Sequence, residues 1–217
     1  MNPITPSPDK SRLRYPDRDG QPMSDNTLQF QWIVTIKEGL EAVFRDDPNV
    51  FVAGDLLWYP VEGDSTIRTA PDTMVVFGRP KGHRSSYRQW REDDIPPQVV
   101  FEVLSPGNRI HQLLEKLYFY QDYGVEEYYV YDPEAGELEG SRRQGDRLRR
   151  IENIKGWVSP RLKVRFDLGE NGDLLLFGPD GRPFATYLEL IAQRDQAEQR
   201  VKRLEEQLRK LGVEPEQ

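Results

Sequence analysis

A strand–helix–strand pattern between residues 98 and 131 constrains the fold of this chain more than any other feature of its sequence. Residues 98–104 read Gln-Val-Val-Phe-Glu-Val-Leu, which is typical of a buried strand, and Ser-Pro-Gly ends the run. A helix is expected over residues 108–123, with Gly124 just after its last turn. Residues 127–131 then form the next strand. The centre of the chain is therefore predicted to place a helix beside a sheet.

The flanking segments add a helix before this unit and short strands on both sides of it. An apolar series indicates a helix that begins at Ser24-Asp25. Its predicted buried face is Leu28, Trp32, Ile36, Leu40 and Val43, with Ile33 and Phe44 beside them. Strands are expected at residues 50–53, 55–59 and 74–77. Antiparallel hairpins are expected from there to residue 183, with a turn at residues 170–173. The pattern predicts an α/β or α+β domain around a mixed sheet.

The C-terminal segment carries a seven-residue repeat. Val201 and Leu208 form one apolar row that Arg194 interrupts, and the second row is Leu190, Ala197, Leu204 and Leu211. This spacing is typical of a coiled coil or a long amphipathic helix. We therefore expect a flexible segment at residues 1–23, a globular domain at 24–186 and a coiled-coil helix and tail at 187–217. Homodimerisation through the C-terminal helix is a hypothesis from the same repeat.

Composition limits the chemistry and the location. The chain has no cysteine and only two histidines, His83 and His111, so a metal site must be built on carboxylate oxygens. Oxygen ligands favour Mg²⁺, Mn²⁺ or Ca²⁺. No apolar run reaches the roughly 20 residues that cross a bilayer, and residues 1–22 lack the apolar core of a signal peptide. We expect a cytoplasmic protein with no membrane partner.

Basic residues are concentrated in two stretches, although the net charge is −7. Residues 79–91 contain five arginines and lysines and no acid, and residues 142–165 contain nine against two acids. Local basic surface governs contact with phosphates more than net charge does. The two stretches either contact nucleic acid or form solvated faces of loops and hairpins, and the sequence leaves both interpretations open.

Asp72 and Glu102 are the candidate metal ligands. Asp72 opens the strand at residues 74–77, and Glu102 lies among apolar residues, where a carboxylate is costly to bury unless it is paired or bound to a metal. If the two strands are neighbours, both carboxylates can converge on one cation, which would activate water and stabilise charge on a phosphate. The alternatives are a turn aspartate that accepts backbone hydrogen bonds and an edge-strand glutamate that faces water.

Lys116 lies at the edge of the predicted apolar face of the central helix, which is Ile110, Leu113, Leu114, Leu117 and Tyr120. Its side chain either extends outward over apolar surface or points back over the strand that carries Glu102. In the second case its ammonium could orient an attacking water or neutralise a phosphate.

Three linked segments resemble the Uma2 family, which is grouped with the PD-(D/E)XK nuclease superfamily. They are residues 69–76 around Asp72, residues 97–106 around Glu102, and residues 116–133 beginning at Lys116. The resemblance covers roughly residues 24–186, and the coiled-coil tail is also similar to the tails of such proteins.

The resemblance implies a restriction-endonuclease-like core, with a central mixed sheet flanked by helices, that binds Mg²⁺ or Mn²⁺ through Asp72 and Glu102. The lysine of the superfamily, expected two residues after Glu102, is replaced by Leu104, and Lys116 is the candidate to take its role. The implied activity is an endonuclease that hydrolyses nucleic acid, with DNA the expected substrate. Asp55 is a second candidate ligand, with a strand-end role as the alternative. The rival function is a nucleic-acid-binding or coiled-coil interaction protein without catalysis.

Overall fold

The computed structural model describes residues 14–17, 20, 24–107 and 110–210. Its helices are α1 (Thr27–Val43), α2 (Ile110–Asp122), α3 (Tyr187–Lys210) and the short 3-10 helix η2 (Gln89–Arg91). Its strands are β1 (Val50–Gly54), β2 (Trp58–Tyr59), β3 (Thr73–Phe77), β4 (Tyr87–Arg88), β5 (Val99–Val103), β6 (Glu127–Asp132), β7 (Glu137–Gln144), β8 (Arg147–Arg150), β9 (Arg165–Leu168) and β10 (Leu174–Phe177). The chain divides into two compact units, residues 1–183 and 184–217.

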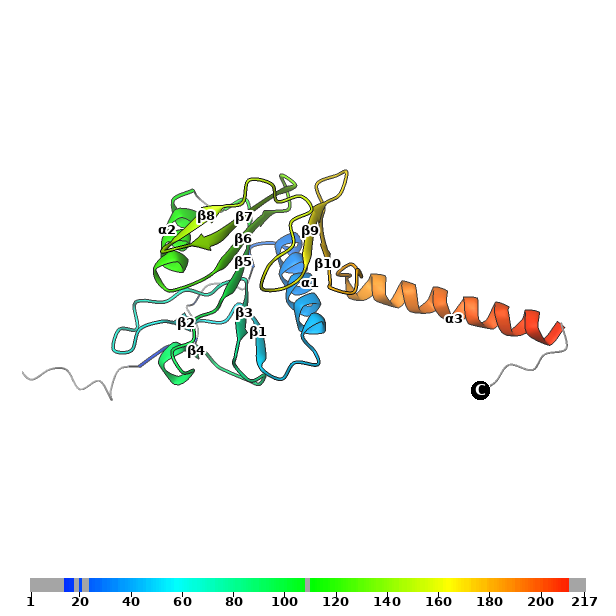
Figure 1. The fold of residues 1–217 in the computed structure, drawn as a ribbon, viewed down its shortest axis with the longest axis horizontal. Coiled ribbons are helices and arrows are strands. Elements are labelled where there is room, and N and C mark those ends of the chain that lie inside the picture. Colours follow the sequence, from blue (N-terminus) through cyan, green and yellow to red (C-terminus); the bar gives the residue numbers. More distant parts are fainter. Residues whose placement is uncertain (1–13, 18–19, 21–23, 108–109, 211–217) are drawn as a thin grey trace, which may run out of the picture. The chain divides into compact units, whose positions relative to one another are not determined.

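A six-stranded mixed sheet forms the centre of the first unit, with the strand order β1-β3-β5-β6-β7-β8. The β5–β6 pair is parallel, and α2 connects these two strands (Figure 1). Every other pair in this sheet is antiparallel. The β9–β10 hairpin and the parallel pair β2–β4 form two smaller sheets. The predictions of an α/β fold with a mixed sheet and of a strand–helix–strand centre are confirmed.

The two faces of the large sheet bury different aromatic clusters, because successive side chains of a strand point to opposite faces. On one face, Tyr129 of β6 stacks on Phe166 of β9, and the adjoining Tyr131 contacts Trp32 of α1 edge-on. On the other face, Tyr128 packs against Tyr120 of α2, whose ring lies parallel to that of Trp58 in β2. Helices α1 and α2 therefore cover opposite faces of the sheet (Figure 1).

The N-terminal helix differs from its prediction in where it begins and in which residue its first turn buries. Asn26, not Ser24 or Asp25, caps it, because the Asn26 side chain accepts a hydrogen bond from the Gln29 amide. Leu28 is 38% exposed, whereas Gln29 is only 6% exposed. The buried row is Gln29, Ile33, Ile36 and Leu40. Ile33, Ile36 and Leu40 are buried as the apolar pattern predicts, so the departure lies in the first turn, where the polar Gln29 takes the core position expected for Leu28.

Two further predictions were wrong in detail. The strand expected at residues 55–59 is only Trp58–Tyr59, because Asp55 adopts a left-handed backbone conformation (φ 45°) that ends the extended run. In α2, Leu114 is 46% exposed, so the inward face turns toward Lys116 and Tyr120. Residues 108–109, where the helix was expected to begin, lie outside the described residues. Gly124 follows the helix with a positive φ of 94°, as predicted.

The second unit contains α3, and its apolar row carries no covering partner among the described residues. Leu190, Val201, Leu204 and Leu208 are all substantially exposed. Leu211, the last member of the predicted repeat, lies outside the described residues. Among the described residues, no helix combines the length and apolar character that a bilayer-spanning segment requires.

Candidate active site

Asp72 and Glu102 meet where β3 and β5 lie side by side. The antiparallel register pairs Thr73 with Phe101, so one residue further along Asp72 comes opposite Glu102. The backbone amide of Val103 donates a 2.7 Å hydrogen bond to Asp72 Oδ2, which holds this carboxylate against the end of β5. Glu102 is 4% exposed, so it does not face water as an edge-strand residue would.

Lys116 joins the two carboxylates from α2. Its Nζ atom donates a 2.6 Å hydrogen bond to Glu102 Oε2, and the side chain is 32% exposed. Burial lowers the pKa of this ammonium, but the charges of Glu102 and Asp72 outweigh it and raise the pKa above its ordinary value. Lys116 is therefore a cation aimed at the carboxylates and not a side chain extended over apolar surface.

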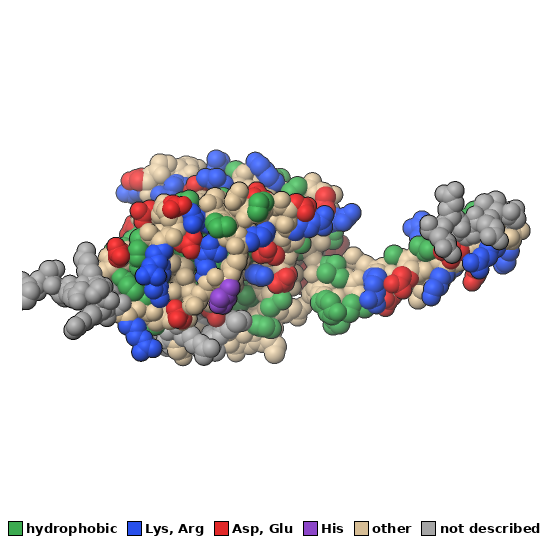
Figure 2. Space-filling view, turned by 90° about the horizontal axis from the view of Figure 1, so that it is seen from below, with side chains coloured by type: hydrophobic (Ala, Val, Ile, Leu, Met, Phe, Trp, Pro, Cys, Tyr) green, Lys and Arg blue, Asp and Glu red, His purple; other side chains and the backbone are tan. Residues whose placement is uncertain are grey.

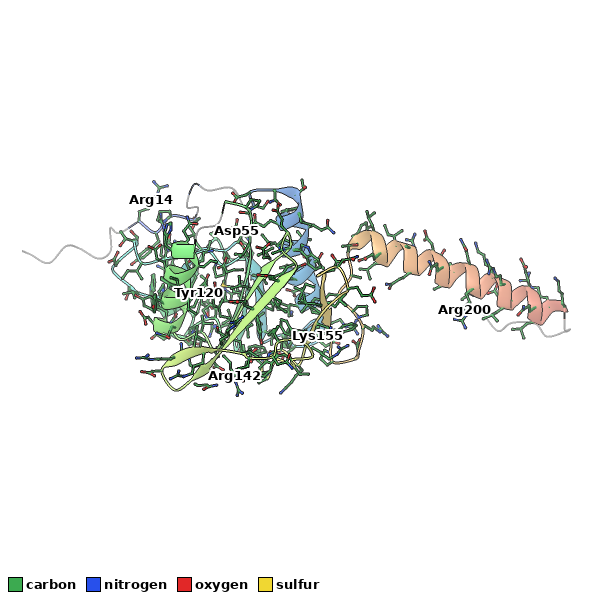
Figure 3. All side chains as sticks on the ribbon, turned by 90° about the horizontal axis from the view of Figure 1, so that it is seen from above. Arg14, Asp55, Tyr120, Arg142, Lys155 and Arg200 are labelled. Atoms are coloured by element: carbon green, nitrogen blue, oxygen red, sulfur yellow. The ribbon has the colours of Figure 1, made fainter. Side chains whose placement is uncertain are left out.

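Tyr120 is a functional candidate that the sequence analysis missed. Its buried hydroxyl donates a hydrogen bond to Glu102 Oε1, so each oxygen of this carboxylate has a donor from α2. Burial and the charge of Glu102 raise the pKa of Tyr120 well above 10, which keeps the phenol protonated and able to donate. The spacing of four residues between Lys116 and Tyr120 could have indicated a shared helix face. Figure 3 shows Tyr120 on α2.

Gln29 is a second residue that the sequence analysis missed. Its side-chain amide donates a 2.8 Å hydrogen bond to the carbonyl of Val103, and its Oε1 atom accepts one of 2.7 Å from the amide of Asp25. The amide and carbonyl groups of Val103 are thus held by Asp72 and Gln29 respectively. Nothing in the sequence indicated this contact, because the apolar pattern placed Leu28 and not Gln29 at the buried position of the first turn.

The negative charges of Asp72 and Glu102 are only partly balanced by Lys116. Burial raises the pKa of Asp72 well above 3.8, and the charge of Glu102 raises it further, while Lys116 lowers it only in part. Two carboxylates with a single lysine therefore carry excess negative charge. A cation that bound both would remove this excess, which is the electrostatic property expected of a metal site.

These residues line one open cavity of about 690 Å³. Asp55 lines it too, and the charge of Asp55 contributes to the pKa shifts of both Asp72 and Lys116. Further lining residues come from the start of α1, from the loop before β3 and from α2: Asp25, Gln29, Arg68, Thr69, Glu115 and Phe119. The cavity therefore collects residues from four separate segments of the sequence around the end of β5.

The donor set suits a divalent cation that prefers oxygen ligands. Within the described part of the chain, no three acidic or histidine side chains form a group that could hold a metal ion, so Asp55 does not complete such a group. Asp72 and Glu102 supply two carboxylates, which is the number that Mg²⁺ commonly takes from a protein while waters and substrate phosphates complete its octahedron. The residues present fit Mg²⁺ or Mn²⁺ in chemistry and in number.

The first basic stretch, residues 79–91, is largely neutralised within the fold. Arg79 and Arg84 both form ion pairs with Glu92, Lys81 pairs with Glu41, and Arg88 lies 3.6 Å from Asp17. Figure 2 shows basic and acidic side chains interspersed over one face of the globular unit. This stretch is therefore mainly a set of internal ion pairs.

The second basic stretch lies away from the cavity. Among the described residues, Arg142, Arg147 and Arg149 have no carboxylate within ion-pair distance, and Arg142 stands directly opposite Arg149 in the β7–β8 hairpin. Arg142 is also opposite Glu127 on β6, on the sheet face of Tyr129 and not on that of Tyr120. Figure 3 shows Arg142 on the other side of the unit from Asp55.

The two histidines, the tryptophans and Tyr59 do not line the cavity with Asp72 and Glu102, as the described lining residues show. His83 and His111 are exposed. Trp58 and Tyr59 are fully buried, and Trp157 donates a hydrogen bond to Tyr129. Trp90 packs against Tyr15. These aromatic residues are therefore packing residues.

The fold and the site define a class of protein: a mixed-sheet α/β domain with a paired aspartate and glutamate at adjoining strand ends and a lysine delivered by the next helix. A sequence model described as "Uma2: Putative restriction endonuclease" matches residues 7–166, and the chain belongs to the Uma2 family.

Other comparisons add little. One similar solved structure is described as a "putative nuclease belonging to DUF820" from Anabaena variabilis ATCC 29413. It shares 13% sequence identity at a TM-score of 0.47, over 62% of this chain and 72% of that one. No curated protein matches the chain.

Proposed function

We propose that this protein is a metal-dependent endonuclease that hydrolyses phosphodiester bonds of nucleic acid, with DNA as its substrate. The observation that carries the proposal is the convergence of Asp72, Glu102 and Lys116 in one open cavity. Two carboxylates that can hold a divalent cation, with an ammonium beside them, are groups that support metal-assisted hydrolysis of a phosphodiester, and family membership supports the same reaction.

Asp72 and Glu102 are the residues that would hold Mg²⁺ or Mn²⁺. When bound, the cation supplies a water of lowered pKa and offsets charge on the phosphate. Asp72 is oriented for this by the Val103 amide, and Glu102 by Tyr120 and Lys116. Because these contacts come from the strand and from the neighbouring helix, both carboxylates are positioned before any ligand arrives.

Lys116 orients the attacking water or neutralises charge that develops on the phosphate. Its ammonium stays protonated at neutral pH, because Glu102 and Asp72 raise its pKa. A lysine two residues after Glu102 would point to the same side of the strand as Glu102, and Lys116 contacts Glu102 directly from α2. The shift of the lysine onto α2 is therefore compatible with catalysis.

The test is cleavage of a mixed set of DNA and RNA substrates, single- and double-stranded, with Mg²⁺ or Mn²⁺ and with EDTA. Wild type is compared with Asp72→Asn and Glu102→Gln, which keep the size of each side chain. Glu127→Gln is the matched control, because Glu127 is a buried strand glutamate that lies outside the cavity. Metal-dependent cleavage that both site variants lose and the control keeps would support the proposal. Binding without cleavage in wild type would favour the non-catalytic alternative.

We also propose that α3 mediates homodimerisation. Its apolar row is exposed along the helix, and the spacing of Leu190, Val201, Leu204 and Leu208 matches the seam of a coiled coil. Two copies of the same helix would bury this row, and a dimer would offer two active sites for two strands of a duplex.

A further inference from the structure

We propose that Arg68 binds a phosphate of the nucleic-acid strand beside the bond that is cleaved. This inference rests on the proposed function and adds a substrate-binding residue to the site. Arg68 precedes β3 and lines the same cavity as Asp72, Glu102 and Lys116. The sequence analysis did not single it out, because it lies outside both basic stretches.

The cavity needs a free cation to admit a polyanion. Among the described residues, its lining carboxylates are Asp25, Asp55, Asp72, Glu102 and Glu115, whereas its lining cations are Arg68 and Lys116. Lys116 is already paired with Glu102 at 2.6 Å. A phosphodiester entering this cavity therefore meets an acidic wall, and a bound divalent cation would act mainly at Asp72 and Glu102. Attraction for a neighbouring phosphate must come from another group.

Arg68 has the donors for this role. Its one hydrogen bond within the described residues is a long contact of 3.4 Å from Nη1 to the Tyr59 hydroxyl, and no carboxylate there lies within ion-pair distance. A guanidinium carries five N–H donors, so most of them remain for a ligand. A forked, permanently charged group of this kind matches the oxygens of a phosphate.

The backbone beside Arg68 is held in place. Thr69 exchanges two backbone hydrogen bonds with Trp58, of 2.8 and 3.2 Å, and Trp58 is fully buried. The Tyr59 hydroxyl that contacts Arg68 itself donates a 2.6 Å hydrogen bond to the Pro16 carbonyl. Arg68 therefore starts from a fixed point at the cavity, and less conformational entropy is lost when it binds a ligand.

Within the described part of the chain, the two basic stretches do not supply this cation. The stretch at residues 79–91 is largely neutralised by Glu41, Asp17, Glu92 and Asp93. Arg142 and its neighbour Arg149 in the β7–β8 hairpin lie on the other face of the large sheet. Arg142 is thus an unpaired arginine that does not line the cavity, and it provides a matched control.

The test is binding of fluorescently labelled 20-nucleotide DNA and RNA, single-stranded and duplex, in EDTA so that no cleavage occurs. Wild type is compared with Arg68→Ala, Arg68→Lys and Arg142→Ala over a range of salt concentrations. Loss of one charged contact is expected to weaken binding by Arg68→Ala roughly 10- to 100-fold. The slope of log affinity against log salt should fall by about one. The affinity of Arg68→Lys should lie between those of wild type and Arg68→Ala, because lysine keeps the charge but cannot donate two parallel hydrogen bonds. Arg142→Ala should bind with wild-type affinity.

Three results would overturn the proposal. Arg68→Ala could bind with wild-type affinity, Arg142→Ala could lose as much affinity as Arg68→Ala, or the wild type could bind none of the probes. The failure of this proposal is separable from that of the nuclease function. Metal-dependent cleavage with unchanged binding in Arg68→Ala would remove the phosphate contact alone. If the wild type cleaves nothing but Arg68→Ala still binds more weakly than the wild type, the phosphate contact is supported and the catalytic function is not.

Discussion

Lys116 donates a 2.6 Å hydrogen bond to Glu102, which lies fourteen residues earlier at the end of β5. Helix α2, which follows β5 in the chain, thus places the Lys116 ammonium beside the Glu102 carboxylate of that strand. We expect Lys116→Met to lower cleavage roughly 100-fold or more, since a positioned group of this kind contributes about that factor. The measurement is kcat on the best substrate with Mg²⁺.

Leu104 provides the control for this prediction. It follows Glu102 by two residues and continues the sheet through its amide, which donates to the Tyr131 carbonyl. A lysine there would point to the same side as Glu102. The double variant Leu104→Lys/Lys116→Met is expected to recover part of the activity. Wild-type cleavage by Lys116→Met alone would show that the lysine is not catalytic.

Tyr120→Phe should lower kcat about tenfold while KM stays near its wild-type value. The substitution keeps the ring beside Trp58 but leaves Glu102 Oε1 without its phenolic donor. A buried acceptor that loses its partner also costs about 1–3 kcal/mol in the free energy of unfolding. Steady-state kinetics and denaturant unfolding measure the two effects. Tyr118→Phe, on the exposed side of the same helix, should change neither; equal losses in both variants would contradict a specific role.

Asp72→Asn should stabilise the metal-free protein at neutral pH. Burial and Glu102 raise the pKa of Asp72 in the folded state above 3.8, so the folded state binds this proton more tightly than the unfolded state does. Stability is therefore lost as the pH rises through the raised pKa. In EDTA, Tm of Asp72→Asn is expected to exceed that of wild type at pH 7, and the difference should shrink toward pH 4.

Divalent cation provides the matching control for the Asp72 prediction. Mg²⁺ should raise Tm of wild type at pH 7, because a ligand that binds the folded state stabilises it, and should do so much less for Asp72→Asn. An Asp72→Asn protein less stable than wild type throughout this pH range would show that Asp72 is a structural residue.

Glu127→Gln should lower stability without lowering activity. The Glu127 carboxylate accepts hydrogen bonds from the Tyr129 hydroxyl, the Ser159 hydroxyl and the Arg161 amide, and it is 1% exposed. An amide cannot accept all three, so about 1–3 kcal/mol of the free energy of unfolding should be lost. Denaturant unfolding beside a cleavage assay checks both parts. Activity that falls further than the folded fraction would contradict a purely structural role.

Leu204→Lys should reduce self-association of the full chain. The substitution places a charge in the apolar row of α3, where two helices would face each other. Gln199→Lys places the same charge on the opposite side of the helix and should have no effect. Sedimentation velocity of the two variants and wild type gives the comparison. A wild type that is monomeric at micromolar concentration would exclude the dimer.

The sequence by itself determined the kinds of element and the chemical nature of the site. Apolar runs and turn residues identified the central strands, α2 with its glycine stop, and the long C-terminal helix, because these features depend on local pattern. The absence of cysteine and the scarcity of histidine limited any metal site to carboxylate oxygens. Asp72 and Glu102 stood out because each adjoins or lies within an apolar run.

Only the tertiary structure decided which polar residues meet. Glu102 and Glu127 have the same local signature of a glutamate in an apolar strand, yet one opens on the cavity and the other binds the loop around Ser159. Gln29, and not Leu28, became the core residue of the first turn of α1, and the basic stretch at residues 79–91 was neutralised mainly by acids outside it. Such outcomes depend on register, rotation and long-range pairing. Register, rotation and long-range pairing are set when the whole chain packs, because the interactions that stabilise them join residues far apart in the sequence.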